Sequence, residues 1–183
     1  MSEYYEPKNL EDKLTKRGYQ KYALTTALGL EIDKIPLTRT NSEVGFFFYD
    51  SRVEEFSHFL EKFSKRTKAK QIIINEITQR IIIPKKCFLV ANLHEEIIGT
   101  LMGVLNSQGF LYIGDVLVHP QFRRQNIATS MLNKLVVDWG LSNKTKYVWL
   151  QIEKDNYKAQ NLYQKLGMKI IYSYYYMKKS PSK

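Results

Sequence analysis

The stretch Val118-His119-Pro120-Gln121-Phe122-Arg123-Arg124-Gln125-Asn126-Ile127-Ala128-Thr129 decides the fold. It joins a segment predicted as a strand over 110–118 to a helix predicted over 127–139. A helix start presents unpaired backbone N–H groups and the positive end of the helix dipole, and two arginines beside it add charged donors. Asn126 tolerates a left-handed backbone better than most residues. The stretch therefore predicts either a cradle for an anion such as pyrophosphate or an ordinary solvated helix cap.

Short strands precede this loop, and strands and helices alternate after it. The preceding strands are expected over 87–93, 97–105 and 110–118, with turns between them. The following elements are expected to be a strand over 147–153, a helix over 157–166 and a strand over 169–177. The order β-β-β-α-β-α-β predicts an α/β (α+β) fold with a mixed, mostly antiparallel central sheet flanked by helices, because a strand-helix-strand crossover packs back onto one sheet.

Two helices and a strand are expected upstream of these strands. The strand covers 46–49, and Asp50 or Ser51 is expected to cap the first helix. The apolar face of that helix consists of Val53, Phe56, Phe59, Leu60 and Phe63. The second helix is expected over 69–78.

The first 34 residues are predicted to form an extension of the main domain. A short helix capped by Asn9 and ended at Gly18 should lead into a strand over 22–32. The turn-rich segment 34–42 predicts a linker, so we divide the chain into an extension, 1–34, and a domain, 35–183. The extension has a weak echo of residues 161–168, which is either the relic of a second, mostly lost copy of the domain or chance.

The composition is that of a globular, soluble protein. Of 183 residues, 44% are hydrophobic and 25% charged, and no apolar run approaches the length of a membrane helix. The N-terminus lacks the pattern of a secretory signal. The single cysteine, Cys87, reads as a small core residue and fits a reducing, cytoplasmic location.

The charge balance predicts an anionic ligand. The formal net charge is +10, and it is spread along the chain without a dense basic run. Charge alone does not choose between a phosphorylated cofactor, nucleic acid and an anionic membrane.

Two motifs resemble those of the GNAT N-acetyltransferases. The stretch 118–128 is similar to the family's acetyl-CoA loop, with Asn126 at the position of the first glycine. Downstream, Asn156, Ala159, Leu162-Tyr163 and Leu166-Gly167-Met168 resemble the family's Asn, Ala, Leu-Tyr, Leu-Gly-Phe signature, with Met168 in place of phenylalanine. The resemblance covers about 46–179.

This resemblance implies a fold, a reaction and a cofactor site. The fold is the GNAT-like acyl-CoA N-acyltransferase fold, and the reaction is direct transfer of acetyl from acetyl-CoA to a primary amine in a ternary complex. Asn156 and the backbone of Val116, Leu117 and Val118 are implied to bind the pantetheine arm, in a gap between the strands of Val118 and Leu150. The implied pyrophosphate ligands are Arg123, Arg124, Gln125, Asn126, Ile127, Ala128 and Thr129.

The catalytic groups are predicted with alternatives. Tyr163 matches the position whose phenol protonates the departing thiolate in this family; otherwise it is a core aromatic residue. Either Asp115 or Glu153 is expected to take the proton from the amine. Asp115 is either a buried carboxylate or a strand-end residue that reaches solvent. A backbone N–H near Leu117 or Val118 is expected to stabilise the developing oxyanion.

The partners are predicted in outline. The acceptor is an unidentified amine, on a small molecule or on a protein, and the chain is a monomer or a homodimer. No metal is expected, since His94-Glu95-Glu96 lacks the second histidine of a zinc helix. No membrane or nucleic-acid partner is expected. The alternative function is a basic, non-catalytic module on the same scaffold that binds RNA or ribosomes.

One further cluster allows two interpretations. Tyr172, Tyr174, Tyr175 and Tyr176 are expected to form either a strand with aromatic residues covered on both faces or an aromatic wall of the acceptor pocket.

Overall fold

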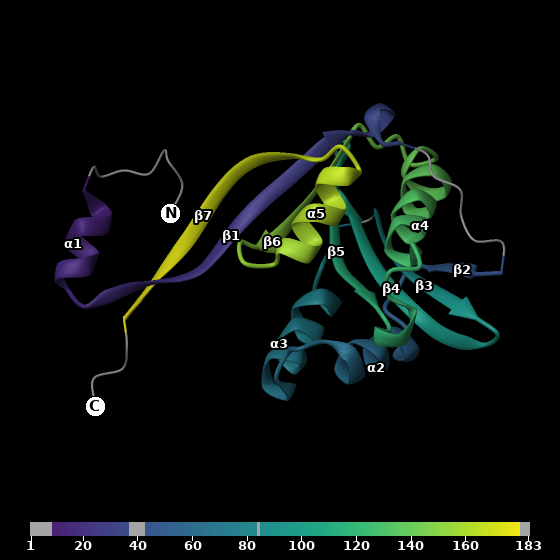
Figure 1. Ribbon diagram of the computed structural model, residues 1–183, viewed down its shortest axis with the longest axis horizontal. Coiled ribbons are helices and arrows are strands. Elements are labelled where there is room, and N and C mark those ends of the chain that lie inside the picture. The colour runs from purple at the N-terminus through teal and green to yellow at the C-terminus, as the bar shows by residue number, and fades with distance from the viewer. Residues whose placement is uncertain (1–8, 37–42, 84, 180–183) are drawn as a thin grey trace. The chain divides into compact units, whose positions relative to one another are not determined.

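The computed structural model describes residues 9–36, 43–83 and 85–179 (Figure 1). The chain divides into two compact units: the larger comprises 31–149, and the smaller comprises 1–30 and 150–183. Strand β6 (Tyr147–Glu153) begins in the larger unit and ends in the smaller one. Among the described residues, the strands form one seven-stranded sheet, in which hydrogen-bonded neighbours follow the order β2-β3-β4-β5-β6-β1-β7.

The larger unit is built on an antiparallel meander. Its strands are β2 (Gly45–Tyr49), β3 (Lys85–Leu93), β4 (Glu96–Leu105) and β5 (Phe110–Val118). Its helices are α2 (Glu54–Phe63), α3 (Lys68–Gln79) and α4 (Ile127–Lys134), and α4 continues as a π-helical segment, Leu135–Gly140.

Strand β4 shows why helices cover both faces of the meander. Successive side chains of a strand point to opposite faces. Met102 and Val104 pack with Phe56 and Leu60 of α2 in one apolar cluster. At the intervening position, a methyl group added to Gly103 would lie 3.0 Å from a side-chain atom of Leu135, which follows α4. Hence α2 and α4 cover opposite faces of the sheet.

A β-bulge interrupts β5 just before the loop. Thr100 pairs with Leu117 and Met102 with Gly114, so β5 has one more residue than β4 between these pairs. Asp115 lies within the bulge and has a left-handed backbone, φ 50°. Such bulges bend a strand and redirect its side chains. This one breaks the strict alternation of side chains along β5 between Gly114 and Leu117.

The smaller unit contains a long two-stranded pairing. Its elements are α1 (Leu10–Lys16), β1 (Tyr19–Glu31, up to residue 30), the end of β6, α5 (Tyr157–Lys165) and β7 (Lys169–Lys179). β1 and β7 are antiparallel from Tyr19 opposite Lys179 to Gly29 opposite Lys169. In Figure 1 these two strands lie side by side, and α1 lies beyond the end at which β1 begins.

The predicted fold class, a mixed sheet flanked by helices, is confirmed, and Asn9 is the N-cap residue of α1 as predicted, but the predicted cap of α2 was wrong. Asn9 has a left-handed backbone and no side-chain cap bond. Val53, rather than Asp50 or Ser51, is the N-cap of α2. The predicted linker lies partly outside the described residues, since 37–42 are not described. The division into 1–34 and 35–183 stays a prediction.

The structure contradicts one of the two interpretations of the tyrosine-rich strand. Tyr172 and Tyr176 are exposed, so the aromatic residues of β7 are not covered on both faces. Among the described residues, no helix has the length and apolar character needed to cross a membrane.

Candidate functional site

The loop after β5 is held by short-range hydrogen bonds. His119 N–H donates to the carbonyl of Ile98 on β4 at 2.9 Å, and the His119 ring contacts Phe63 with ring centroids 4.3 Å apart. A 3-10 turn, Pro120–Phe122, follows. Arg123 Nε donates to the carbonyl of Val118 at 3.1 Å, which ties the loop back to the end of the strand. The entry to α4 is therefore fixed by the sheet.

The start of α4 is free of a side-chain cap. Asn126 is the N-cap residue with φ 60°, and its side chain makes no cap hydrogen bond. Asn126 thus has the left-handed backbone that its residue type tolerates. The Ser130 N–H donates to the Asn126 carbonyl at 2.9 Å and is the first helical bond, so the N–H groups of Ile127, Ala128 and Thr129 precede the intrahelical bonding. This donor set fits a pyrophosphate.

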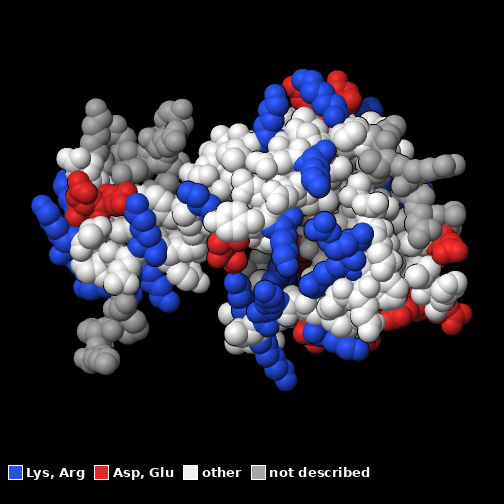
Figure 2. All heavy atoms as spheres, viewed as in Figure 1, with Lys and Arg blue, Asp and Glu red and all other residues white. Residues whose placement is uncertain are grey.

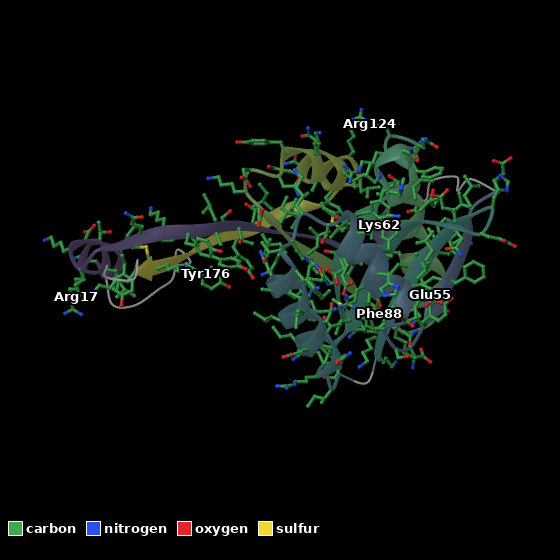
Figure 3. The ribbon with its side chains drawn as sticks, turned by 90° about the horizontal axis from the view of Figure 1, so that it is seen from below. Arg17, Glu55, Lys62, Phe88, Arg124 and Tyr176 are labelled. Carbon is green, nitrogen blue, oxygen red and sulfur yellow. The ribbon has the colours of Figure 1, made fainter. Side chains whose placement is uncertain are left out.

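Both arginines of the loop are exposed, as are the two residues that follow them. Arg124 also has a left-handed backbone, φ 66°. Figure 3 labels Arg124, whose side chain extends outward beside α4. Exposed guanidinium groups next to free amides can donate charged hydrogen bonds to an anionic ligand.

Asp115 is a buried, paired carboxylate. Its side chain is 6% exposed, and Arg66 Nη2 donates to its Oδ1 at 2.6 Å. This settles the alternative that the sequence left open in favour of burial. Arg66, between α2 and α3, also reaches Gln71, whose Oε1 is 3.5 Å from Nη1.

A second arginine lies near Asp115. Arg52 Nε donates to Ser57 Oγ at 2.9 Å, its guanidinium lies 5.3 Å from the ring centroid of Phe56, and burial lowers its pKa. Burial, followed by the charge of Asp115, raises the pKa of Tyr112. Neither arginine was predicted, since nothing in the sequence around Arg52 or Arg66 marks them as neighbours of Asp115.

The other predicted residues lie in the smaller unit. Glu153 ends β6 and is exposed. Asn156 is the N-cap of α5, and its Oδ1 accepts a hydrogen bond from Ala159 N–H at 3.2 Å. Tyr163, on α5, is 5% exposed. A cavity of about 390 Å³ is lined by Ala23, Leu24, Glu153, Lys154, Asp155 and Tyr157.

The site residues thus form two groups. Asp115, Val116–Val118 and the loop 123–129 belong to the larger unit, where they follow one another along β5 and into α4. Glu153, Asn156 and Tyr163 belong to the smaller unit, on β6 and α5. Within the described residues, no group of three or more His, Cys, Asp and Glu side chains lies close enough to hold a metal ion.

Cys87 is buried in the core, as predicted, and burial raises its pKa to about 12. We expect negligible reaction with a thiol reagent at pH 8 in the native protein and rapid reaction in denaturant, because the thiolate is the reactive form. Above the ordinary thiol pKa of 9.0, only the unfolded chain loses the proton, so the free energy of unfolding should fall as pH rises from 9 toward 12. Rapid labelling of the native protein would contradict this.

Comparison with known families matches residues 47–168 to the acetyltransferase (GNAT) family. Among solved structures, a functionally unknown conserved protein from Staphylococcus epidermidis ATCC 12228 has a TM-score of 0.70 and 15% identity, over 96% of this chain and 68% of that chain. A tandem GNAT protein from the clavulanic acid biosynthesis pathway has a TM-score of 0.71 and 11% identity, over 98% of this chain and 61% of that one.

A third similar structure contains the cofactor. It is the aminoglycoside N-acetyltransferase AAC(6')-Iy in complex with CoA, with a TM-score of 0.54 and 15% identity over 72% of this chain and 91% of that one. At such identities the likeness is one of fold. The chain spans 61% of the length of the tandem protein, so it corresponds to only part of that longer structure.

Proposed function

This chain belongs to the GNAT acetyltransferase family, and we propose that it transfers the acetyl group of acetyl-CoA to a primary amine by direct transfer in a ternary complex. The observation that carries the proposal is the open start of α4. There the side chain of Asn126 makes no cap bond, and the amides of Ile127, Ala128 and Thr129, which precede the first helical bond, come directly after the exposed loop that contains Arg123 and Arg124. An anion at this position meets both the helix dipole and charged donors.

The cofactor contacts follow from this assignment. The pyrophosphate of CoA binds the loop from Arg123 to Thr129, including Gln125. The pantetheine arm binds the backbone of Val116, Leu117 and Val118, and Asn156 makes a further contact. In this structure the Asn156 side-chain oxygen caps α5, so its amide nitrogen is the group that remains for the pantetheine.

The reaction forms a C–N bond and breaks the C–S bond of the thioester. The neutral amine attacks the carbonyl carbon, a backbone N–H near Leu117 or Val118 stabilises the negative charge that develops on the carbonyl oxygen, and the thiolate departs. Tyr163 donates its phenolic proton to that thiolate, and the amine loses a proton to a carboxylate.

Glu153 is the better candidate for the proton acceptor. The Asp115 carboxylate is buried and bound by Arg66, whereas Glu153 is exposed at the end of β6. We expect Glu153→Gln to lower kcat about 100-fold, a typical loss for a general base. Asp115→Asn should instead lower the free energy of unfolding by about 3 kcal/mol, because Arg66 loses its charged partner.

The matched control for this pair is Asp155→Asn, which removes a neighbouring negative charge and should leave kcat unchanged. Steady-state kinetics and urea unfolding measure the two effects. Full activity of Glu153→Gln together with an inactive but stable Asp115→Asn would reverse the two assignments.

The acceptor amine is proposed as a class only, on a small molecule or a protein, in a cytoplasmic setting. Free CoA released from acetyl-CoA by the purified chain, measured with a thiol reagent across a panel of amino acids, polyamines, aminoglycosides and peptide amines, tests the proposal. Amine-dependent release supports it. If no amine stimulates the release of CoA and the chain does not bind CoA, the non-catalytic binding module becomes the better hypothesis.

A further inference from the structure

The smaller unit exposes a two-stranded ribbon. Lys154 N–H donates to the Leu24 carbonyl at 2.8 Å, which marks the end of contact between β1 and the β6 side. From Tyr19 to Tyr22, β1 is paired with β7, and its partners there run from Lys179 to Tyr176. A two-stranded ribbon gains little stability from its own pairing. Helix α1 contacts one face of the ribbon, where Glu11 binds Lys21 and Tyr175, and the side chains of Tyr22 and Tyr176 point to the opposite face.

Four tyrosines share one face of this ribbon. Tyr172, Tyr174 and Tyr176 alternate along β7, so they point to the same side, and Tyr22 lies directly opposite Tyr176. The ring centroids are 5.9 Å apart between Tyr172 and Tyr174 and 5.6 Å apart between Tyr174 and Tyr176. We call these four residues, with Lys178, the tyrosine face. Figure 3 labels Tyr176 on the ribbon.

The tyrosine face is accessible. Tyr22 and Tyr176 are each 57% exposed and Tyr172 is 42% exposed. Single exposed aromatic residues are common, but a continuous row of them marks a binding surface. Neighbouring ring planes are tilted by 36° between Tyr172 and Tyr174 and by 77° between Tyr174 and Tyr176, so the row offers separate ring faces along the strand.

The ribbon is also basic. Lys178 continues the row, with its Nζ 5.6 Å from the ring centroid of Tyr22. β1 and β7 together contain four lysines, and their one acidic residue is Glu31, at the far end of β1. In Figure 2, Lys and Arg atoms surround α1 and the adjoining end of the ribbon. The acidic Glu11 of α1 is bound by Lys21 at 2.6 Å and by the hydroxyl of Tyr175.

We propose that the tyrosine face binds single-stranded nucleic acid, with unpaired bases stacked on Tyr172, Tyr176 and Tyr22 and phosphates near Lys178. Aromatic side chains spaced along a basic surface are the common device for binding single strands without sequence preference. A duplex hides its base faces, so it offers nothing for the rings to stack on. This site is separate from the proposed site of acetyl transfer. The sequence, whose charges are dispersed along the chain, predicted no nucleic-acid partner, and the present proposal revises that prediction.

Fluorescence anisotropy of the full chain tests the proposal with three labelled probes: a 12-nucleotide oligo-U RNA, an oligo-dT of the same length and a 12-base-pair DNA duplex, all at 50 mM salt. We expect both single strands to bind at least about 10-fold more tightly than the duplex. Binding of the RNA alone or of the DNA alone would also support the site. Equal or tighter binding of the duplex, or no binding of either single strand, would overturn it.

Substitutions locate the binding surface. Tyr172→Ala with Tyr176→Ala should weaken single-strand binding at least about 10-fold, since each stacked base is worth roughly 5- to 150-fold. The control Tyr157→Ala removes a tyrosine of α5 that is 69% exposed and should have no effect. Lys178→Ala should reduce the steepness of the salt dependence.

Two further measurements distinguish a loss of nucleic-acid binding from unfolding and from self-association. If the double alanine variant unfolds, shown by circular dichroism, Tyr172→Ser alone serves in its place. Binding that survives these substitutions would overturn the proposal. So would a self-association of the chain, measured by sedimentation, that the same substitutions abolish and that oligonucleotides do not change, because the face would then be occupied by a second copy. Binding of CoA stays unchanged in every ribbon variant, so failure here is distinct from failure of the acetyltransferase proposal.

Discussion

Replacing Tyr163 with Phe should lower kcat for acetyl transfer by about 100-fold while the Kd for CoA stays within about two-fold. The substitution removes one oxygen from a buried side chain of α5 and keeps the ring that fills its place. If the phenol protonates the departing thiolate, the loss falls on the chemical step. Steady-state kinetics and calorimetric titration of CoA measure the two quantities separately.

Tyr147→Phe is the matched control. It removes the phenolic hydroxyl from the first residue of β6 and keeps the aromatic ring, whose centroid lies 5.8 Å from that of Phe110. We expect unchanged kcat. An equal loss of kcat and of CoA affinity in Tyr163→Phe, accompanied by a lower unfolding midpoint, would mean that Tyr163 is a structural aromatic residue.

Reversing both loop charges, with Arg123→Glu and Arg124→Glu, should weaken CoA binding by at least about 100-fold. Each guanidinium is proposed to donate to the pyrophosphate, charged hydrogen bonds contribute about 1.5–3 kcal/mol each, and the new carboxylates repel the ligand. Calorimetric titration of CoA at two salt concentrations measures the loss of CoA affinity and the part of that loss that is electrostatic.

Arg80→Glu, which changes the net charge by two units where the double loop variant changes it by four, is the control for a charge reversal elsewhere in the same unit. Arg80 is the exposed C-cap residue of α3, so this variant changes the charge of the same unit without touching the loop. A double variant of the loop that binds CoA as tightly as Arg80→Glu would remove the arginines from the proposed site.

The fold could be predicted from the sequence because its strands carry local signals. The strand 147–153 coincides with β6, and the helix after it begins at Tyr157 as predicted. The cap of α2 was harder, since Asp50 and Ser51 are good cap residues but the chain only bends there and the helix begins after Val53. Capping preference is a weak local force that the packing of the apolar face of α2 overrides.

The surroundings of the candidate site could be predicted only in part. The left-handed Asn126 followed from its side-chain type and its place in the loop. The ion pair of Asp115 with Arg66 joins residues 49 positions apart, and the bulge at Asp115 depends on how β5 pairs with β4, so no local pattern encodes either feature. The tyrosine row was visible in the sequence, but its exposure depends on which strands pair with β1 and β7.

The structure of this chain determined with bound CoA tests the central claim most directly. We predict that the diphosphate accepts hydrogen bonds from the backbone N–H groups of Ile127, Ala128 and Thr129, with Arg123 and Arg124 beside it. A diphosphate bound elsewhere, with the Asn126 side chain folded over these amides, would contradict the claim.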